Sequence, residues 1–111
     1  YRMHSYIAEE LPALIAAHFP ADPARAGVFG HSMGGHGALT IHQKHPDRFR
    51  SCSAFAPIVA PSGVPWGRKA FGHYLGPDEA RWAAYDATRL LGERGPSPAH
   101  LLIDQGTNDQ F

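Results

Sequence analysis

The stretch Gly30-His31-Ser32-Met33-Gly34 decides the fold of this chain. It matches the pattern Gly-x-Ser-x-Gly and follows a short apolar run at 26–29, which is typical of a buried strand. A helical pattern over 33–45 comes next and ends where a proline follows His45. A strand, a tight turn and a helix around this motif form the nucleophile elbow of α/β-hydrolases. Ser32 is therefore the predicted nucleophile.

The chemistry of an elbow sets further requirements on its neighbours. The turn is so sharp that the residues two before and two after the serine must be small, and Gly30 and Gly34 satisfy this. The helix that follows presents its N-terminus, so the backbone N–H of Met33 is expected to donate to the oxyanion that develops during acyl transfer.

Outside the elbow, strands are expected to alternate with helices. Apolar residues at helical spacing predict a helix over 5–19, with Ser5 as a possible N-cap and a kink or a start near Pro12. The remaining elements are a strand over 49–58, a proline- and glycine-rich loop over 57–77 that could wall a site, a helix over 78–91 capped by Asp78, and a strand over 100–104. This alternation predicts βαβ units and a parallel sheet, hence an α/β fold.

Composition limits the classes of function. Of 111 residues, 43% are apolar and 18% charged, which is typical of a globular domain. Ten basic and ten acidic residues cancel without a basic run, so we expect a small-molecule partner and no nucleic acid. No window has the length and hydropathy of a membrane span or a signal peptide, so we expect no membrane partner. The single Cys52 lies in an apolar stretch, where a buried, inert thiol is expected, and this fits a reducing compartment.

A catalytic acid should follow a later strand than the serine. Asp109 is so placed, in the loop after the strand at 100–104, and is preferred over Asp104, which ends that strand and has less freedom to reach a site. The catalytic histidine should come after the acid, yet only Gln110 and Phe111 remain. Because the chain also begins without methionine, we expect residues 1–111 to be part of a single α/β-hydrolase domain that is truncated at both ends.

The eight histidines present are expected to have surface or packing roles. His42 and His45 are three residues apart on a helix and could in principle share a metal ion, but no third ligand of suitable spacing accompanies them. No metal and no cofactor are therefore expected.

Several longer motifs carry a family resemblance. They are GHSMGGHGAL at 30–39, SAFAPI at 53–58, PWGRKAFGHYLG at 65–76, YDAT at 85–88 and LIDQGTNDQF at 102–111. Together they resemble the S-formylglutathione hydrolases, also called the esterase D family, over nearly the whole chain.

The resemblance implies a cytoplasmic serine thioesterase, often a homodimer, that hydrolyses the glutathione thioester S-formylglutathione to formate and glutathione in formaldehyde detoxification. By position, Ser32 matches the family's nucleophile, Met33 its oxyanion-hole amide and Asp109 its charge-relay aspartate. The family's histidine and its upstream oxyanion loop have no counterpart here. Trp66 could line the substrate cleft, although a core role is equally open.

Two alternatives stay open. Ser32 and Asp109 would serve a general carboxylesterase or acyltransferase of the same fold equally well, and only the motifs between 65 and 88 favour the glutathione thioester. The missing histidine would also fit a non-catalytic fragment or a decayed homologue.

Overall fold

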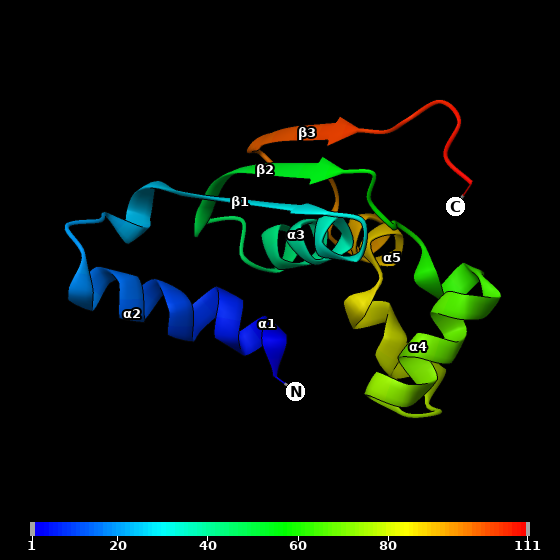
Figure 1. Cartoon of the computed structure of the whole chain (residues 1–111). Coiled ribbons are helices and arrows are strands. Elements are labelled where there is room, and N and C mark those ends of the chain that lie inside the picture. The colour runs from blue at the N-terminus through cyan, green and yellow to red at the C-terminus, as the bar shows by residue number, and fades with distance from the viewer. Residues whose placement is uncertain (1, 111) are drawn as a thin grey trace.

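A three-stranded parallel sheet organises the computed structural model, which describes residues 2–110. Its strands, in the order β1–β2–β3, are β1 (Ala26–His31), β2 (Phe49–Phe55) and β3 (His100–Asp104). Helices α3 (Met33–Lys44) and α5 (Ala87–Arg94) lie on one side of this sheet, and no described element lies on the other side (Figure 1). The parallel α/β architecture expected from the sequence is confirmed.

The core forms where α3 packs on the sheet. One buried cluster joins Ala38 and Leu39 of α3 to Cys52 and Ala54 of β2 and to Ala87 of α5. Burial raises the pKa of the Cys52 thiol to about 11, and its side chain is 1% exposed. The burial of this thiol predicted from the sequence is therefore confirmed.

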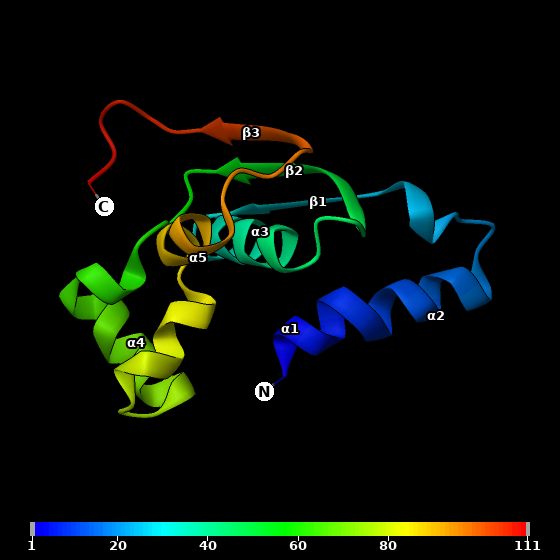
Figure 2. The same cartoon turned by 180° about the vertical axis from the view of Figure 1, so that it is seen from behind.

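The N-terminal helix is continuous across its proline. It comprises α1 (Met3–Ser5), a π-helical segment (Tyr6–Glu10) and α2 (Leu11–His18), and it runs below β1 in both views (Figure 2). Pro12 has no N–H to donate to the carbonyl of Ala8, and the Arg48 guanidinium donates to that oxygen instead, at 2.6 Å. Ser5 has helical backbone angles and makes no cap hydrogen bond, so its expected role as N-cap was wrong.

The segment expected to be a long loop is largely helical. It contains a 3₁₀ turn (Pro61–Gly63) and helix α4 (Pro65–Leu75), which ends at Gly76 with φ +89°. Several of its prolines and glycines, which are also common in loops, occupy helical positions here. Pro65 occupies the first helical turn, where proline is favoured, and Gly67 allows close packing, because a Cβ there would lie 2.1 Å from the carbonyl oxygen of Pro61.

The single helix predicted over 78–91 is in fact two elements. Asp78 caps a 3₁₀ helix (Glu79–Tyr85) by accepting from Ala80 N, and Asp86 then caps α5. The break arises because Asp86 has an extended backbone, φ −109° and ψ 118°, which helical residues do not adopt. Asp78 is thus a cap, as predicted, but of a shorter element.

One edge of the sheet is strongly apolar and open. The side chains of Leu101, Leu102 and Ile103 in β3 are each about half exposed, at 50–52%.

Among residues 2–110, no helix combines the length and hydropathy needed to cross a membrane.

Candidate active site

Ser32 lies at the turn between β1 and α3 with a strained backbone. Its φ of +56° and ψ of −117° fall in a region that residues with a side chain rarely adopt. Within residues 2–110, Ala56 is the only other non-glycine residue with positive φ, and it directly follows β2. The elbow conformation predicted for Ser32 is therefore present.

Backbone hydrogen bonds fix the peptide groups on both sides of Ser32. Its N–H donates to the carbonyl oxygen of Phe55 at 2.9 Å. Its own carbonyl oxygen accepts from the N–H of His36 at 3.1 Å and from the N–H of Ile58 at 3.3 Å. The elbow is thus tied to its helix and to the segment that leaves β2.

The glycines around Ser32 contribute unequally. A Cβ on Gly30 would lie 2.1 Å from the carbonyl oxygen of Gly34, and a Cβ on Gly35 would lie 3.0 Å from the Cβ atom of Pro57. A Cβ on Gly34 would meet nothing within 4 Å. The steric requirement expected at Gly30 is confirmed, whereas the one expected at Gly34 is wrong for the described residues, because the crowding comes from its carbonyl and not from its side-chain position.

Met33 is the first residue of α3, so helix geometry gives its N–H no partner within the helix. Its side chain is 69% exposed. The N–H of Met33 therefore lies at the positive end of the helix dipole, in the residue directly after Ser32.

The loop bearing Asp109 begins at the carboxyl end of the sheet, the end at which Ser32 also lies. Strand pairing sets His31 beside Phe55, and Phe55 beside Asp104, so the carboxyl ends of the three strands are level. Figure 1 shows the three arrowheads at one end of the sheet, with the chain after β3 running past that end. Asp109 is exposed and accepts a hydrogen bond from the Gln105 amide at 2.6 Å. Phe111, the last residue of the motif at 102–111, lies outside the described residues.

Asp104 occupies the final position of β3, as predicted. Its backbone carbonyl accepts from Ala56 N at 2.6 Å, which ties the ends of β2 and β3 together. This bond engages the backbone of the strand end, whereas Asp109 lies beyond it in a turn.

The histidines of α3 are engaged away from the Ser32 hydroxyl. His36 accepts a hydrogen bond from Ala87 N at its Nε2, at 3.3 Å, which requires a neutral ring. Burial lowers the pKa of His36, and the nearby Asp86 carboxylate only partly opposes this shift.

His42 is 1% exposed, and its Nε2 lies 2.7 Å from the Ser97 hydroxyl, so of the surface and packing roles expected for the histidines it has a packing role in the core. His45 stacks on His4, with ring centroids 5.1 Å apart. No set of three or more His, Cys, Asp or Glu residues within 2–110 is arranged to hold a metal ion.

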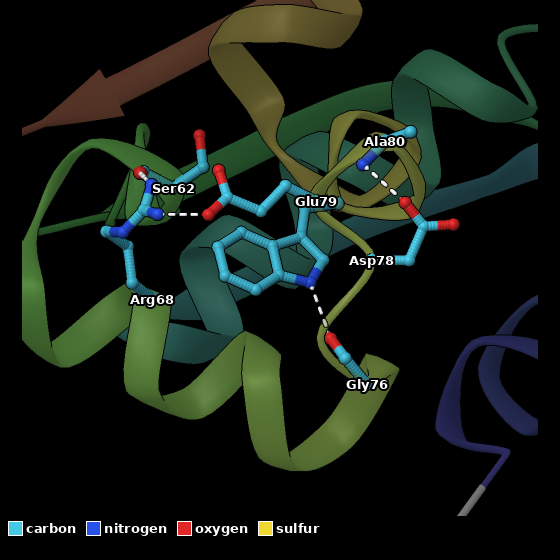
Figure 3. Close-up of polar contacts among 7 residues, drawn as sticks. Ser62, Arg68, Gly76, Asp78, Glu79 and Ala80 are labelled. Atoms are coloured by element: carbon cyan, nitrogen blue, oxygen red, sulfur yellow. Dashed lines mark hydrogen bonds and ion pairs between the residues drawn. The ribbon is translucent and has the colours of Figure 1, made fainter.

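Trp66 lies in the first turn of α4 and is 42% exposed, so its ring faces solvent in part. The residue that fills the core of this region is Trp82, which is 5% exposed and donates its indole N–H to the carbonyl of Gly76 at 3.0 Å (Figure 3).

Sequence reasoning missed Asp86, whose side chain is completely buried. One carboxylate oxygen accepts from the backbone N–H and the hydroxyl of Ser62, at 3.1 and 2.6 Å. The other accepts from the N–H groups of Thr88 and Arg89, both at 3.1 Å. Burial acts to raise the pKa of Asp86, but these hydrogen bonds outweigh it and hold the pKa below its usual range. The signal that could have found it is an aspartate directly before the apolar helical pattern at 87, 90 and 91.

One apolar hollow has no contact with Ser32. It measures about 450 Å³, lies between the N-terminal helix and β1, and is lined mainly by apolar side chains, among them Ile7, Leu11, Ile15, Val28 and Phe29. Ser32, Met33 and Asp109 are not among the residues that line it, so the candidate site is the carboxyl end of the sheet and not this hollow.

Comparison with known proteins identifies the family. The esterase family model, described as "Putative esterase", matches residues 1–111. The chain is 58% identical over 111 residues to the S-formylglutathione hydrolase of Rattus norvegicus and 54% identical to that of Paracoccus denitrificans. It superimposes on the S-formylglutathione hydrolase of Agrobacterium tumefaciens with a TM-score of 0.93 and 58% identity, covering all of this chain and 40% of that one.

The chain spans about two fifths of the length of these relatives, 39% in both curated proteins. The sequence identity exceeds 50% over the whole length of this chain, and the strained serine lies at a strand–helix turn. Both observations agree on the fold. The chain therefore belongs to the esterase family, in which its relatives are S-formylglutathione hydrolases and its sheet is part of an α/β-hydrolase fold.

Proposed function

We propose that this chain forms the nucleophile-bearing part of a serine thioesterase that hydrolyses S-formylglutathione to formate and glutathione, as in glutathione-dependent formaldehyde detoxification. The observation that carries the proposal is the elbow itself, with Ser32 at φ +56° between β1 and α3. The substrate rests on the relatives, because a Gly-x-Ser-x-Gly elbow alone serves many esters.

The reaction proceeds in two steps on Ser32. Its hydroxyl oxygen attacks the formyl carbon while a histidine accepts the hydroxyl proton, and the Met33 N–H donates to the oxyanion. The carbon–sulfur bond then breaks, glutathione leaves as a good thiolate leaving group, and water hydrolyses the formyl-serine to release formate. No cofactor is required for either step.

Asp109 orients the histidine and stabilises its protonated form. That histidine and the second oxyanion donor are supplied by residues outside 1–111, so we infer that this chain is one portion of a longer α/β-hydrolase domain, called the full-length protein below. We further propose that the full-length protein is cytoplasmic and can form a homodimer, as the resemblance implies.

Trp66 is proposed to line the substrate cleft from the start of α4. Its partial exposure supports this, because a ring with a purely structural role would be expected in the core, where Trp82 lies. The segment that carries Trp66 begins at the carboxyl end of the sheet beside Ser32, because the N–H of Ile58 donates a hydrogen bond to the Ser32 carbonyl oxygen.

The test is a steady-state assay on the full-length protein with S-formylglutathione and p-nitrophenyl acetate, and with Ser32→Ala as the control. We expect a strong preference for the thioester and no activity in the variant. A preference for the simple ester would support a general carboxylesterase or acyltransferase instead. Inactivity with both substrates, and no histidine codon in the continuing reading frame, would support a non-catalytic protein.

A further inference from the structure

The carbonyl group of Ser32 is held from two directions. The N–H of His36 reaches it from within α3, and the N–H of Ile58 reaches it from the segment that follows β2. A backbone in a sparsely populated region persists only where the surrounding structure over-determines it. Whatever fixes Ile58 and His36 therefore fixes the nucleophile.

The start of α5 fixes the segment around Ile58. The carbonyl of Val59, the next residue, accepts from both the N–H and the hydroxyl of Thr88, at 3.0 and 2.9 Å. Three residues further on, Ser62 donates two hydrogen bonds to the buried carboxylate of Asp86. The segment is thus held at two points by residues 86–88.

The same residues fix the other side of the elbow. Ala87 donates its N–H to the His36 ring one helical turn after Ser32. Asp86 sets the position of this N–H, because its second carboxylate oxygen caps α5 through Thr88 and Arg89. Both ties to the Ser32 carbonyl therefore lead to one completely buried carboxylate.

A cluster formed by α4 and the 3₁₀ helix Glu79–Tyr85 also contacts Ser62 (Figure 3). The Arg68 guanidinium donates to the Ser62 carbonyl at 3.3 Å, forms an ion pair with Glu79 and lies 5.3 Å from the centre of the Trp82 ring. In Figure 3 the labelled side chains of Arg68 and Glu79 point toward one another. Ser62 is thus fixed between this cluster and Asp86.

We propose that Asp86 is a positioning residue that holds the strained Ser32 elbow in its reactive geometry through Ser62, Thr88 and Ala87. This inference rests on the proposed function, because it assumes that Ser32 is a nucleophile. Asp86 does not touch the substrate. Its loss should lower the reactivity of Ser32 itself, with little effect on how tightly a small substrate binds.

The variant Asp86→Asn isolates this role. Asparagine caps helices as well as aspartate, so its oxygen can keep the bonds from Thr88 and Arg89. Its NH₂ group would then face the N–H of Ser62, where two donors meet in a completely buried site. Asp78→Asn is the matched control, because Asp78 is an exposed cap that accepts from Ala80 N at 3.0 Å and, among the described residues, has no hydrogen bond to Ser62, Ala87 or Thr88.

The measurement is the second-order rate of Ser32 phosphonylation by a fluorophosphonate in the full-length protein, together with kcat and KM for p-nitrophenyl acetate. In this probe reaction the serine oxygen bonds to phosphorus and fluoride leaves, so no glutathione recognition is involved. We expect Asp86→Asn to lower the phosphonylation rate and kcat by about 10- to 100-fold, with KM within about 2-fold, because small displacements of a nucleophile have effects of this size. Asp78→Asn should match the wild type.

Each other outcome has a definite meaning. A lower melting temperature with an unchanged rate below the unfolding transition would make Asp86 merely structural and overturn the proposal, as would a change confined to KM. If Asp86→Asn does not fold, Ser62→Ala, which removes only the hydroxyl bond, should show a smaller loss in the same direction, and an unchanged rate there would overturn it. A wild-type protein that does not react with the probe would overturn the nucleophile assignment and this inference with it.

Discussion

A Cβ atom on Gly30 would lie 2.1 Å from the carbonyl oxygen of Gly34. The end of β1 and the first turn of α3 therefore approach one another so closely that only a hydrogen atom fits at the side-chain position of Gly30. Backbone atoms cannot rotate away as a side chain can, so this contact sets how sharply the chain reverses at Ser32.

Replacing Gly30 by alanine should therefore distort the elbow. We expect Gly30→Ala to lower the free energy of unfolding by about 3 kcal/mol, the upper part of the usual range for overpacking, and to abolish hydrolysis. Gly34→Ala is the matched control, because its Cβ meets nothing within 4 Å and alanine favours a helix by up to about 1 kcal/mol. Urea unfolding of the full-length protein checks both. Equal losses in the two variants would show that this contact does not limit the elbow.

The strain at Ser32 predicts opposite effects of two inactivating substitutions. Ser32→Gly should raise the free energy of unfolding by about 1 kcal/mol, because glycine adopts positive φ without a Cβ penalty. Ser32→Ala keeps the Cβ and should bring no such gain. Both should be inactive. Equal stability of the two variants would mean that the backbone at this position carries no strain.

The elbow could be predicted from the sequence because its determinants are local. Gly30, Ser32 and the helical pattern after them lie within one short stretch, and the strand at 100–104 is a short apolar run after a turn. The strand predicted over 49–58 is also present, but it ends at Phe55, where Ala56 adopts a positive φ. Local preference and the tertiary structure agree on the existence of these elements, so pattern reasoning was sufficient to find them.

The segment from 57 to 86 could not be predicted in the same way. Pro65 and Gly67 are as common in loops as at the start of a closely packed helix, and only the contact with Pro61 distinguishes the two cases. Asp78 and Asp86 have equal local signals for a helix cap. The hydrogen bonds from Ser62, 24 residues away in sequence, are what make Asp86 the buried one.

The stacked pair His4 and His45 predicts loss of stability in acid. The Nε2 atoms of both rings are buried without a hydrogen-bond partner. Burial lowers the pKa of both; Lys44 and His45 lower that of His4 further, Arg48 lowers that of His45, and Glu9 opposes the shift in each. The folded state therefore binds fewer protons, so the contribution to stability is full above pH 6.5, the unfolded value, and is lost as pH falls below it.

We expect His45→Phe, which keeps the ring stack but cannot be protonated, to make the melting temperature less dependent on pH between 7 and 5. His36 and His42 also have lowered pKa values, so part of the acid dependence should remain. His73→Gln, at an exposed histidine outside this pair, is the control for the loss of one histidine. A profile for His45→Phe identical to that of the wild type would contradict this role for the pair.

The buried Cys52 should be unreactive until the protein unfolds. Because burial raises its pKa from 9.0 to about 11, thiol reagents should modify it only after addition of denaturant. Its contribution to stability should be full below pH 9 and lost as pH rises towards 11. Cys52→Ser should lower the free energy of unfolding by about 1–3 kcal/mol, since the hydroxyl would lie among Ala38, Leu39 and Ala54. Rapid native-state labelling would contradict the burial.

Asp104, at the end of β3, and Asp109, in the loop after it, should differ sharply in their effect on catalysis. If Asp109 orients the catalytic histidine, Asp109→Asn should lower kcat for S-formylglutathione by about 10³- to 10⁴-fold, the loss typical of a triad whose acid is replaced by its amide. Asp104→Asn is the matched control, since the backbone bond that ties Asp104 to Ala56 survives the change. Its kcat should stay within a few-fold of the wild type. Fluorophosphonate labelling of both variants checks that Ser32 is still accessible. A large loss in Asp104→Asn with an active Asp109→Asn would transfer the role of the acid to the end of the strand.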